Sequence, residues 1–289
     1  MPVHIIADSA SDLPLSYFEE YNVTFIPLKV HLDGRDYEDL REIGPQEVYT
    51  AMKAGKSPMT SQPSLEHVIE IFTDFAQSGR SGVYLAFSSE LSGTYQTAVM
   101  ALGQVKEEYP DLDLDIIDTK CASLGYGLVV RNAVEQAAKG ADKASIMTDA
   151  VFHSTHMEHL FTVDNLEYLA RGGRISKASA FIGGLLNIKP LLNVEDGKLI
   201  PLEKIRGKKK LLKRVLELMG ERGESLSAQT VAISHADDEE TAQEWKDSII
   251  AEFGVRDVII HPIGATIGAH AGPGTIALFF LNELPKPMD

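Results

Sequence analysis

The sequence predicts an α/β protein with two α/β domains, the first with a mostly parallel sheet flanked by helices and the second with a smaller mixed sheet. Short runs rich in β-branched residues alternate with longer amphipathic segments, a pattern typical of parallel strands joined by helices. The length of 289 residues is large for one core and suits two domains. Because the pattern changes near residues 149–154, we expect domains at residues 1–152 and 153–289.

The first half is expected to alternate four strands with four helices. The strands are expected at residues 4–8, 24–30, 83–88 and 114–118. The helices are expected at residues 45–54, 64–77, 94–108 and 124–139. Polar loops follow three of the strands, "DSASD", "SSELSG" and "DTKCAS". The carboxyl ends of parallel strands face the ligand crevice, so these loops should converge there.

The second half is expected to form a mixed sheet. Its strongest local signal is "KPLLNVEDGKLIPLEKIR", two alternating runs joined at Asp196-Gly197, which predicts a hairpin. The other strands are expected at residues 159–163, 230–234, 257–262 and 275–281. The helices are expected at residues 165–170, 176–185, 208–219 and 239–253.

Composition excludes several classes of protein. Forty-two acidic and 27 basic residues give a formal charge of −15, which repels phosphate backbones and makes nucleic acid a poor partner. Cys121 is the single cysteine, so no internal disulfide forms, and we interpret it as a packed thiol rather than a nucleophile. The N-terminus has no signal-peptide pattern, and no apolar run approaches 18 residues, so we expect a cytoplasmic protein.

Common catalytic and metal-binding motifs are missing. The sequence has no GxxxxGK[ST], GxSxG, HExxH or CxxC pattern. Asp8 and Asp12 are close enough in sequence to bind a metal, but a Ser/Asp-rich turn explains the same residues, and we expect no metal.

Hydroxyl side chains and glycines occupy unusual positions instead. "MTSQPS" places Thr60 and Ser61 before a proline and a helix start, and Ser92 precedes Gly93 and Thr94 where a strand gives way to a helix. Capping turns explain both segments. The alternative is an anion site made by the Thr60 and Ser92 hydroxyls together with the helix amides near Gly93 and Thr94.

His270 stands in a segment with four glycines, at positions 264, 268, 272 and 274. So many glycines indicate either positive φ angles or a backbone that approaches another group closely. We expect a loop between two strands. In the simpler interpretation His270 is a satisfied histidine of a tight connection.

Taken together, these segments resemble the DegV family, the bacterial fatty acid-binding proteins that serve as the B subunit of fatty acid kinase. The resemblance rests on "DSASDLP", "TSQPS", "SSELSGTYQTA", "LEYLARGGRIS" and "GAHAGPGTIALFF", in that order along almost the entire chain. It implies two α/β domains, with an acyl chain buried in the first and its carboxylate held near the interface by Thr60 and Ser92. No cofactor is implied beyond the bound long-chain fatty acid.

The resemblance also implies roles for other residues. His270 would reach the carboxylate as a cation or as a neutral donor, with Gly272 and Gly274 allowing close approach. Arg171 matches a family arginine near the same end of the pocket. Ser61, Gly93 and Thr94 are expected to support the site. The acyl tail is expected among Phe25, Ile26, Leu28, Val99, Leu102, Leu124 and Leu128.

The implied function is that of a carrier rather than an enzyme. Because the chain has no phosphate-binding loop, a separate ATP-binding kinase subunit would phosphorylate the carboxylate to an acyl phosphate. A phosphotransfer enzyme that uses His270 is the leading alternative, and a regulatory or nucleic-acid module is the third.

A basic stretch at residues 204–214 opposes the sign of the whole protein. A solvated helix face is the simplest interpretation. The alternatives are a contact with the kinase, for which the resemblance indicates Arg206, and a transient contact with an anionic membrane.

Overall fold

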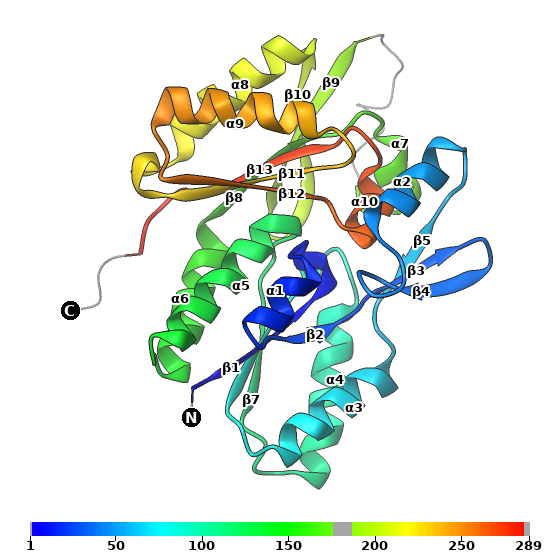
Figure 1. Ribbon diagram of the computed structural model, residues 1–289, viewed down its shortest axis with the longest axis vertical. Coiled ribbons are helices and arrows are strands. Elements are labelled where there is room, and N and C mark those ends of the chain that lie inside the picture. Colours follow the sequence, from blue (N-terminus) through cyan, green and yellow to red (C-terminus); the bar gives the residue numbers. More distant parts are fainter. Residues whose placement is uncertain (1, 176–186, 286–289) are drawn as a thin grey trace.

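The computed structural model describes residues 2–175 and 187–285, which form two sheets stacked end to end with helices around them (Figure 1). The first sheet has the order β2-β1-β6-β7 and is parallel throughout. Its strands are β1 (His4–Asp8), β2 (Thr24–Ile26), β6 (Gly82–Ala86) and β7 (Leu114–Asp118).

Helices cover both faces of this sheet, because its strands carry apolar side chains on both faces. Ile6 and Tyr84 pack against α3 and α4 on one face, whereas Ile5 and Val83 belong to the core on the other. The helices around this sheet are α1 (Leu15–Glu20), α3 (Leu65–Gln77), α4 (Thr94–Glu108), α5 (Ser123–Ala138) and α6 (Lys143–His156). The described residues include no helix with the length and apolar character needed to cross a bilayer.

A small antiparallel sheet, β4-β3-β5, lies beside the first one together with α2 (Pro45–Lys53). Its strands are β3 (Lys29–Leu32), β4 (Arg35–Glu38) and β5 (Met59–Ser61). The prediction of one strand at residues 24–30 is therefore wrong. Pro27 has no amide hydrogen for a ladder, and the chain leaves the parallel sheet there to enter the small one.

The second sheet is mixed, with the order β10-β9-β8-β13-β11-β12. Its strands are β8 (Met157–Thr162), β9 (Ile188–Glu195), β10 (Lys198–Arg206), β11 (Thr230–His235), β12 (Asp257–Pro262) and β13 (Ile276–Leu281). With six strands against four it is the larger sheet, not the smaller one that the sequence predicts. The hairpin adds two long strands at one edge, and β13 inserts between β8 and β11.

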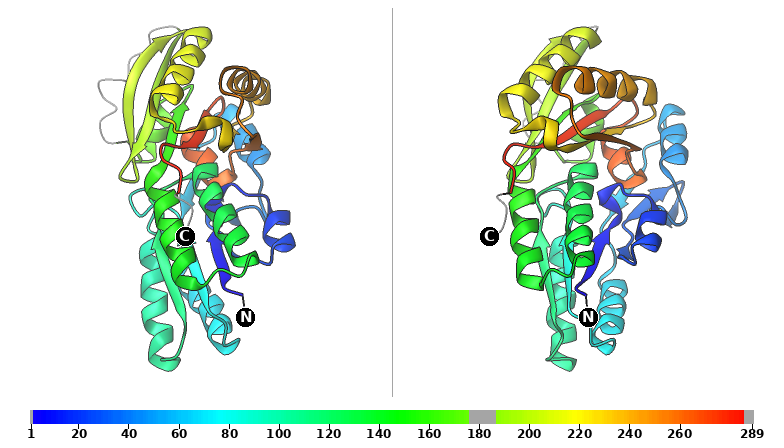
Figure 2. Two further views of the ribbon diagram at one scale, coloured as in Figure 1. Left: turned by 90° about the vertical axis from the view of Figure 1, so that its left-hand side faces the viewer. Right: turned by 60° about the vertical axis from the view of Figure 1, so that its left-hand side comes forward.

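Two amphipathic helices, α8 (Lys208–Arg222) and α9 (Glu239–Phe253), cover one face of the second sheet (Figure 2). The opposite face is turned toward the first half of the molecule. There Phe161 and Phe279 join the same apolar cluster as Leu85 and Leu124, so one core runs from one sheet to the other. The expected boundary at residues 152 and 153 falls within α6, and the division into two domains remains a prediction.

Most predicted elements are confirmed to within two or three residues. The hairpin turns at Asp196-Gly197, where both residues have positive φ as a two-residue turn requires. Helices α1 and α6 and strands β4 and β5 were not predicted, because they are short or weakly amphipathic. The helix predicted at residues 176–185 lies outside the described residues.

The three polar loops converge, as predicted. The Asp8 carboxylate accepts a hydrogen bond from the Phe87 amide at 3.0 Å, and the Asp12 carboxylate accepts one from the Ser123 hydroxyl. The Ser88 amide donates to the Cys121 carbonyl at 3.2 Å. The carboxyl ends of β1, β6 and β7 therefore form one polar edge that faces the second sheet.

Candidate functional site: an amphipathic cavity between the sheets

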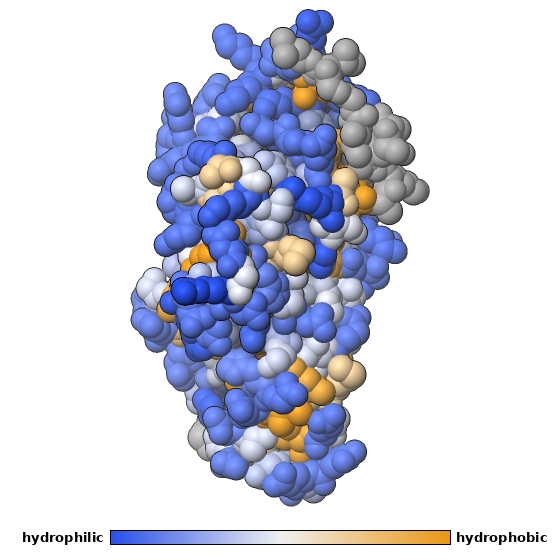
Figure 3. Space-filling model, turned by 90° about the vertical axis from the view of Figure 1, so that its right-hand side faces the viewer, coloured by the Kyte–Doolittle hydropathy of each residue, from blue (hydrophilic) through white to orange (hydrophobic). Residues whose placement is uncertain are grey.

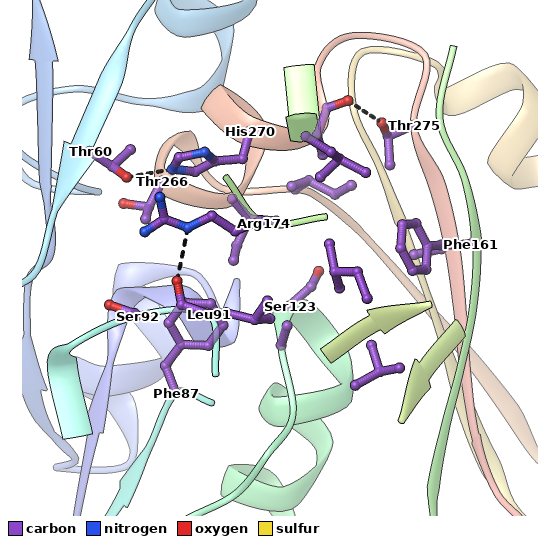
Figure 4. A pocket seen from close by; sticks show the side chains of 18 of the residues that line it. Thr60, Phe87, Leu91, Ser92, Ser123, Phe161, Arg174, Thr266, His270 and Thr275 are labelled. Carbon is purple, nitrogen blue, oxygen red and sulfur yellow. Dashed lines mark hydrogen bonds between the residues drawn. The ribbon is translucent and has the colours of Figure 1, made fainter. Parts of the chain in front are cut away.

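A cavity of about 240 Å³ lies where the polar edge of the first sheet meets the second sheet (Figure 4). Most of its lining is apolar and comes from both halves of the chain, including Leu28, Phe87 and Leu91 on one side and Phe161 and Phe279 on the other. Of the seven residues expected around an acyl tail, only Leu28 lines this cavity. The cavity lies between the sheets, not inside the first half.

Polar side chains gather at one end of the cavity. Thr60 on β5 and His270 on α10 (Ala265–Ala271) come from opposite halves of the chain, and their side chains meet with 2.6 Å between Oγ1 and Nε2. Figure 4 shows Thr60, Ser92, His270 and Arg174 on the same side of the cavity. Two residues that are 210 positions apart in sequence thus form one polar end.

The glycine-rich segment around His270 is a short helix, not the loop that we expected. Two buried carboxyl groups from the first half satisfy its N-terminus: Asp12 accepts from the Gly264 amide at 2.9 Å, and Asp39 accepts from the Thr266 amide at 3.3 Å. At Gly268 a Cβ atom would lie 2.6 Å from the Tyr49 hydroxyl oxygen, so only glycine allows the helix to pack this closely.

We expected Gly272 and Gly274 to let the backbone approach the ligand closely, but neither residue lines the cavity. Both have φ near +81°, and a Cβ atom there would collide with Tyr168 and Asp164, respectively. These glycines let the chain turn from α10 into β13 against the segment that follows β8.

His270 is held in its neutral form. Burial, together with the smaller effect of the nearby Arg174 and Arg171 guanidinium groups, lowers the pKa of its imidazole to about 4. A Cβ atom at Gly172 would lie 2.2 Å from Nδ1, so residue 172 must be glycine for the ring to fit. The sequence allowed His270 to act either as a cation or as a neutral donor. At neutral pH the ring is uncharged and acts as a hydrogen-bond donor or acceptor.

Ser92 lies just before α4. Its hydroxyl is 2.8 Å from the Thr94 hydroxyl and accepts a longer bond from the Thr94 amide at 3.3 Å. Gly93 is the capping residue, and a Cβ atom there would collide with Gln62, which also lines the cavity. Ser61 lines the cavity as well, and its hydroxyl is bonded to His31.

Arg174 reaches the cavity, whereas Arg171 does not line it. The Arg174 side chain donates to the Leu91 carbonyl at 2.9 Å and to the Gly172 carbonyl at 2.6 Å. Arg171 is exposed, donates to Ser57 at 2.9 Å and stacks on the Tyr168 ring. The supporting role expected for Arg171 stays a prediction, and Arg174, three residues further along the chain, is the arginine that lines the cavity.

Arg206 lies far from the cavity, at the end of β10 that is opposite the hairpin turn. It is exposed, as are Lys209 and Lys210, and these three cations form no ion pair with the described residues. Arg214, by contrast, forms ion pairs with Glu203, Glu217 and Glu221.

Sequence reasoning missed the apolar wall. Ala277 and Phe279 line the cavity from β13, with Thr275 just before that strand, and Phe161 lines it from β8 beside the His159 ring. Each set alternates along its strand, so a period of two residues was available as a signal once the strands had been predicted.

The acidic pair that suggested a metal site is engaged in hydrogen bonds. Asp8 accepts from the Tyr84 hydroxyl as well as from the Phe87 amide, and Asp12 bridges Ser123 and Gly264. Across the described ranges, no group of three or more His, Cys, Asp or Glu side chains is arranged to bind a metal ion. Burial also raises the pKa of the Cys121 thiol, as expected for a packed cysteine.

The fold and the cavity define a class of protein: an α/β binding protein with a largely apolar cavity between its two main sheets, polar at one end and suited to an amphiphile. The chain belongs to the DegV family, whose model, described as uncharacterised proteins, matches residues 2–283.

Relatives and solved structures of this family support the assignment. A Thermotoga maritima protein named fatty acid-binding protein is 37% identical over 284 residues, covering 96% of both chains. The structure of a Thermus thermophilus DegV family protein, described as fatty acid binding, aligns with a TM-score of 0.89 and 31% identity over 96% of this chain and 99% of that one. A stearic acid-binding protein from Eubacterium ventriosum aligns with a TM-score of 0.87 and 29% identity over 96% and 97%.

Proposed function

We propose that this protein binds a long-chain fatty acid in the cavity and presents its carboxylate to a separate ATP-binding kinase subunit for phosphorylation to an acyl phosphate. The observation that carries the proposal is the asymmetry of the cavity, in which Thr60, Ser92, His270 and Arg174 gather at one end and most of the remaining lining is apolar. The Thermotoga maritima fatty acid-binding protein is similar in sequence across nearly its full length, and the Thermus thermophilus structure described as fatty acid binding has the same fold across nearly its full length.

The polar end has the donors that a carboxylate needs. With the hydrogen on Nε2, neutral His270 donates to Thr60 Oγ1 and leaves the Thr60 hydroxyl proton free for the ligand. The Ser92 hydroxyl supplies a second donor, and Arg174 supplies positive charge at the same end. The head is thus oriented by hydrogen bonds, and the tail contributes most of the affinity at roughly 0.8 kcal/mol for each buried methylene.

The phosphotransfer alternative loses support in this geometry. Nε2 of His270 is occupied by Thr60, and the other side of the ring is packed against Gly172. A phosphoryl acceptor needs an exposed nitrogen with room for three additional oxygens. We therefore assign His270 to the orientation of the ligand.

Native mass spectrometry tests the proposal directly. Protein purified gently from bacteria should carry a fatty acid in a one-to-one ratio, because an empty apolar cavity of this size is costly in a protein core. Solvent extraction followed by lipid analysis should identify the same acid. Repeated recovery of bare polypeptide that also fails to bind added fatty acid would contradict the proposal.

We further propose that Arg206 contacts the kinase, because it is exposed, carries no ion pair with the described residues and lies outside the cavity. Arg206→Glu should preserve fatty acid binding and raise the apparent KM of the kinase for the loaded carrier. Lys209→Glu is the matched control on the same surface, and its main expected effect is weaker uptake from anionic vesicles. Turnover of preloaded Arg206→Glu at the wild-type KM would exclude the kinase contact.

A further inference from the structure

A second cavity of about 300 Å³ adjoins the first one at the end away from the polar side chains. The turn of the β9–β10 hairpin forms part of its wall, because Asp196 and Gly197 line it. Two side chains, His159 of β8 and Val194 of β9, line both cavities. They therefore stand between the two spaces.

The His159 ring is fixed in place by the backbone on both sides. Its Nδ1 donates to the Met157 carbonyl at 3.0 Å, and its Nε2 accepts from the Ala122 amide at 3.4 Å. These two bonds define one neutral tautomer, consistent with a pKa that burial lowers to about 4. Because both ring nitrogens are occupied, the ring has no polar atom left for a ligand and presents only its surface.

Close packing prevents the ring from moving aside. A Cβ atom at Gly125 of α5 would lie 2.5 Å from Nε2, so the imidazole fills the space that this glycine leaves open. The Phe279 ring packs edge-on against it, with 5.2 Å between the ring centroids. Only 3% of the His159 surface is exposed, so the ring is a rigid wall rather than a mobile gate.

We propose that His159 and Val194 form a partition that stops the methyl end of the bound acyl chain and thereby limits its length. The inference rests on the fatty acid function proposed above and adds the residues that select among the acids. It also gives the second cavity a role, as space that a longer chain reaches when the partition is removed.

The second cavity can accept a hydrocarbon near the partition. Buried Ile117, Cys121 and Met157 contribute apolar lining, whereas Lys120 and Asp196 lie in its polar lining. Each additional methylene that reaches apolar surroundings should raise the affinity roughly fourfold. With the partition present, the same methylene has to displace a hydrogen-bonded ring, so longer acids bind less well.

A competition experiment measures the length limit. Delipidated protein is mixed with an equimolar series of straight-chain saturated acids of increasing length, and native mass spectrometry identifies the bound species. We expect His159→Ala to move the preferred acid to a longer member of the series, with roughly fourfold gain for each methylene that enters the second cavity. Val194→Ala opens the same partition without removing the buried imidazole, so it should shift the preference in the same direction and serves if His159→Ala folds poorly.

Two further variants separate the partition from a general loosening of the fold. Thr155→Ala changes the second cavity alone and should keep the wild-type preference. Ser154→Phe fills the second cavity from its other wall, so the double variant with His159→Ala should return to the wild-type preference.

The outcomes are distinct. A wild-type length preference in both His159→Ala and Val194→Ala, with normal binding of the shorter acids, would overturn the partition while leaving the fatty acid function intact. Failure of the wild-type protein to bind any member of the series would overturn the proposed function itself.

Discussion

The two ends of the cavity are built in different ways. At the polar end, Thr60 lies in the three-residue strand β5, Ser92 precedes α4 and Arg174 follows α7, and their hydrogen bonds are local or cross from one half to the other. At the far end, His159 and Phe279 belong to central strands of a sheet and are fixed by dense packing. A substitution at the polar end therefore changes one hydrogen bond at a time. A substitution at the far end changes the shape and volume of the cavity.

This difference predicts unequal effects of substitution. The largest effect is expected from Ala277→Phe on β13, because the added ring occupies the cavity itself. Displacing roughly four methylenes at about 0.8 kcal/mol each should weaken fatty acid binding roughly a hundredfold. Titration with a fluorescent fatty acid measures the loss. Val99→Phe on the exposed face of α4 is the size-matched control, and an equal loss in both variants would rule out the steric explanation.

Removal of the hydroxyl groups proposed to bind the ligand carboxylate should have the next largest effect. Thr60→Val and Ser92→Ala each remove one hydroxyl, and a hydrogen bond to a charged group contributes about 1.5–3 kcal/mol, so each variant should bind roughly tenfold or more weakly. Isothermal titration calorimetry measures the change. Ser89→Ala, in the same loop but outside the cavity lining, should bind as wild type. Unchanged affinity in the double variant would move the head of the ligand elsewhere.

Gly172→Ala should weaken binding of the ligand carboxylate although it removes no polar side chain. The new methyl would displace the His270 ring, so the variant should resemble His270→Ala. Loss of one neutral hydrogen bond costs about 0.5–1.5 kcal/mol, and affinity should fall roughly threefold to tenfold. Kinase-coupled acyl phosphate formation should fall further than binding, because orientation is lost while the tail stays in place. Gly103→Ala, where a Cβ meets no neighbour within 4 Å, is the control.

The smallest effect concerns pH. Burial raises the pKa of Asp12 from 3.8 to about 8, with its two hydrogen bonds opposing the shift, so the folded state favours the protonated carboxyl. Between pH 6.5 and 8 the Asp12 carboxyl is already ionised in the unfolded chain but still largely protonated in the folded protein. Raising the pH therefore favours the unfolded chain, and the free energy of unfolding should fall by an amount on the order of 1 kcal/mol. Below pH 6.5 the buried His159 and His270 act in the opposite direction, because their pKa values are lowered to about 4.

Urea unfolding at pH 6.5 and 8 measures this slope, which is the change in the free energy of unfolding with pH. Asp12→Asn keeps an acceptor for the Gly264 amide and should flatten the slope, whereas Asp74→Asn, on the exposed side of α3, should leave it unchanged. A slope in Asp12→Asn equal to that of the wild type would assign the proton to another buried group, such as Asp39.

The same contrast explains what the sequence could predict. Thr60, Ser92 and His270 were recognised because hydroxyls, glycines and a histidine at the ends of elements are unusual and resemble a known family. His159 and Phe279 look like any residues of a sheet core, and which face of a strand meets a cavity depends on tertiary packing. Arg174 and Arg171 are three residues apart, and only the turn at Gly172 and Gly173 determines which one points inward.

The six-strand order also governs when the site can form. β13 lies between β8 and β11, which pair with it rather than with each other, although it is the last of the six strands in sequence. As the chain leaves the ribosome, β8–β10 and β11–β12 therefore remain two separate sheet fragments with exposed inner edges until β13 emerges. α10 emerges just before β13, and it can be capped only by Asp12 and Asp39, which were synthesised more than two hundred residues earlier. The nascent protein thus acquires its cavity in a late, long-range step, after both sheet fragments and the capping carboxyl groups have already been synthesised.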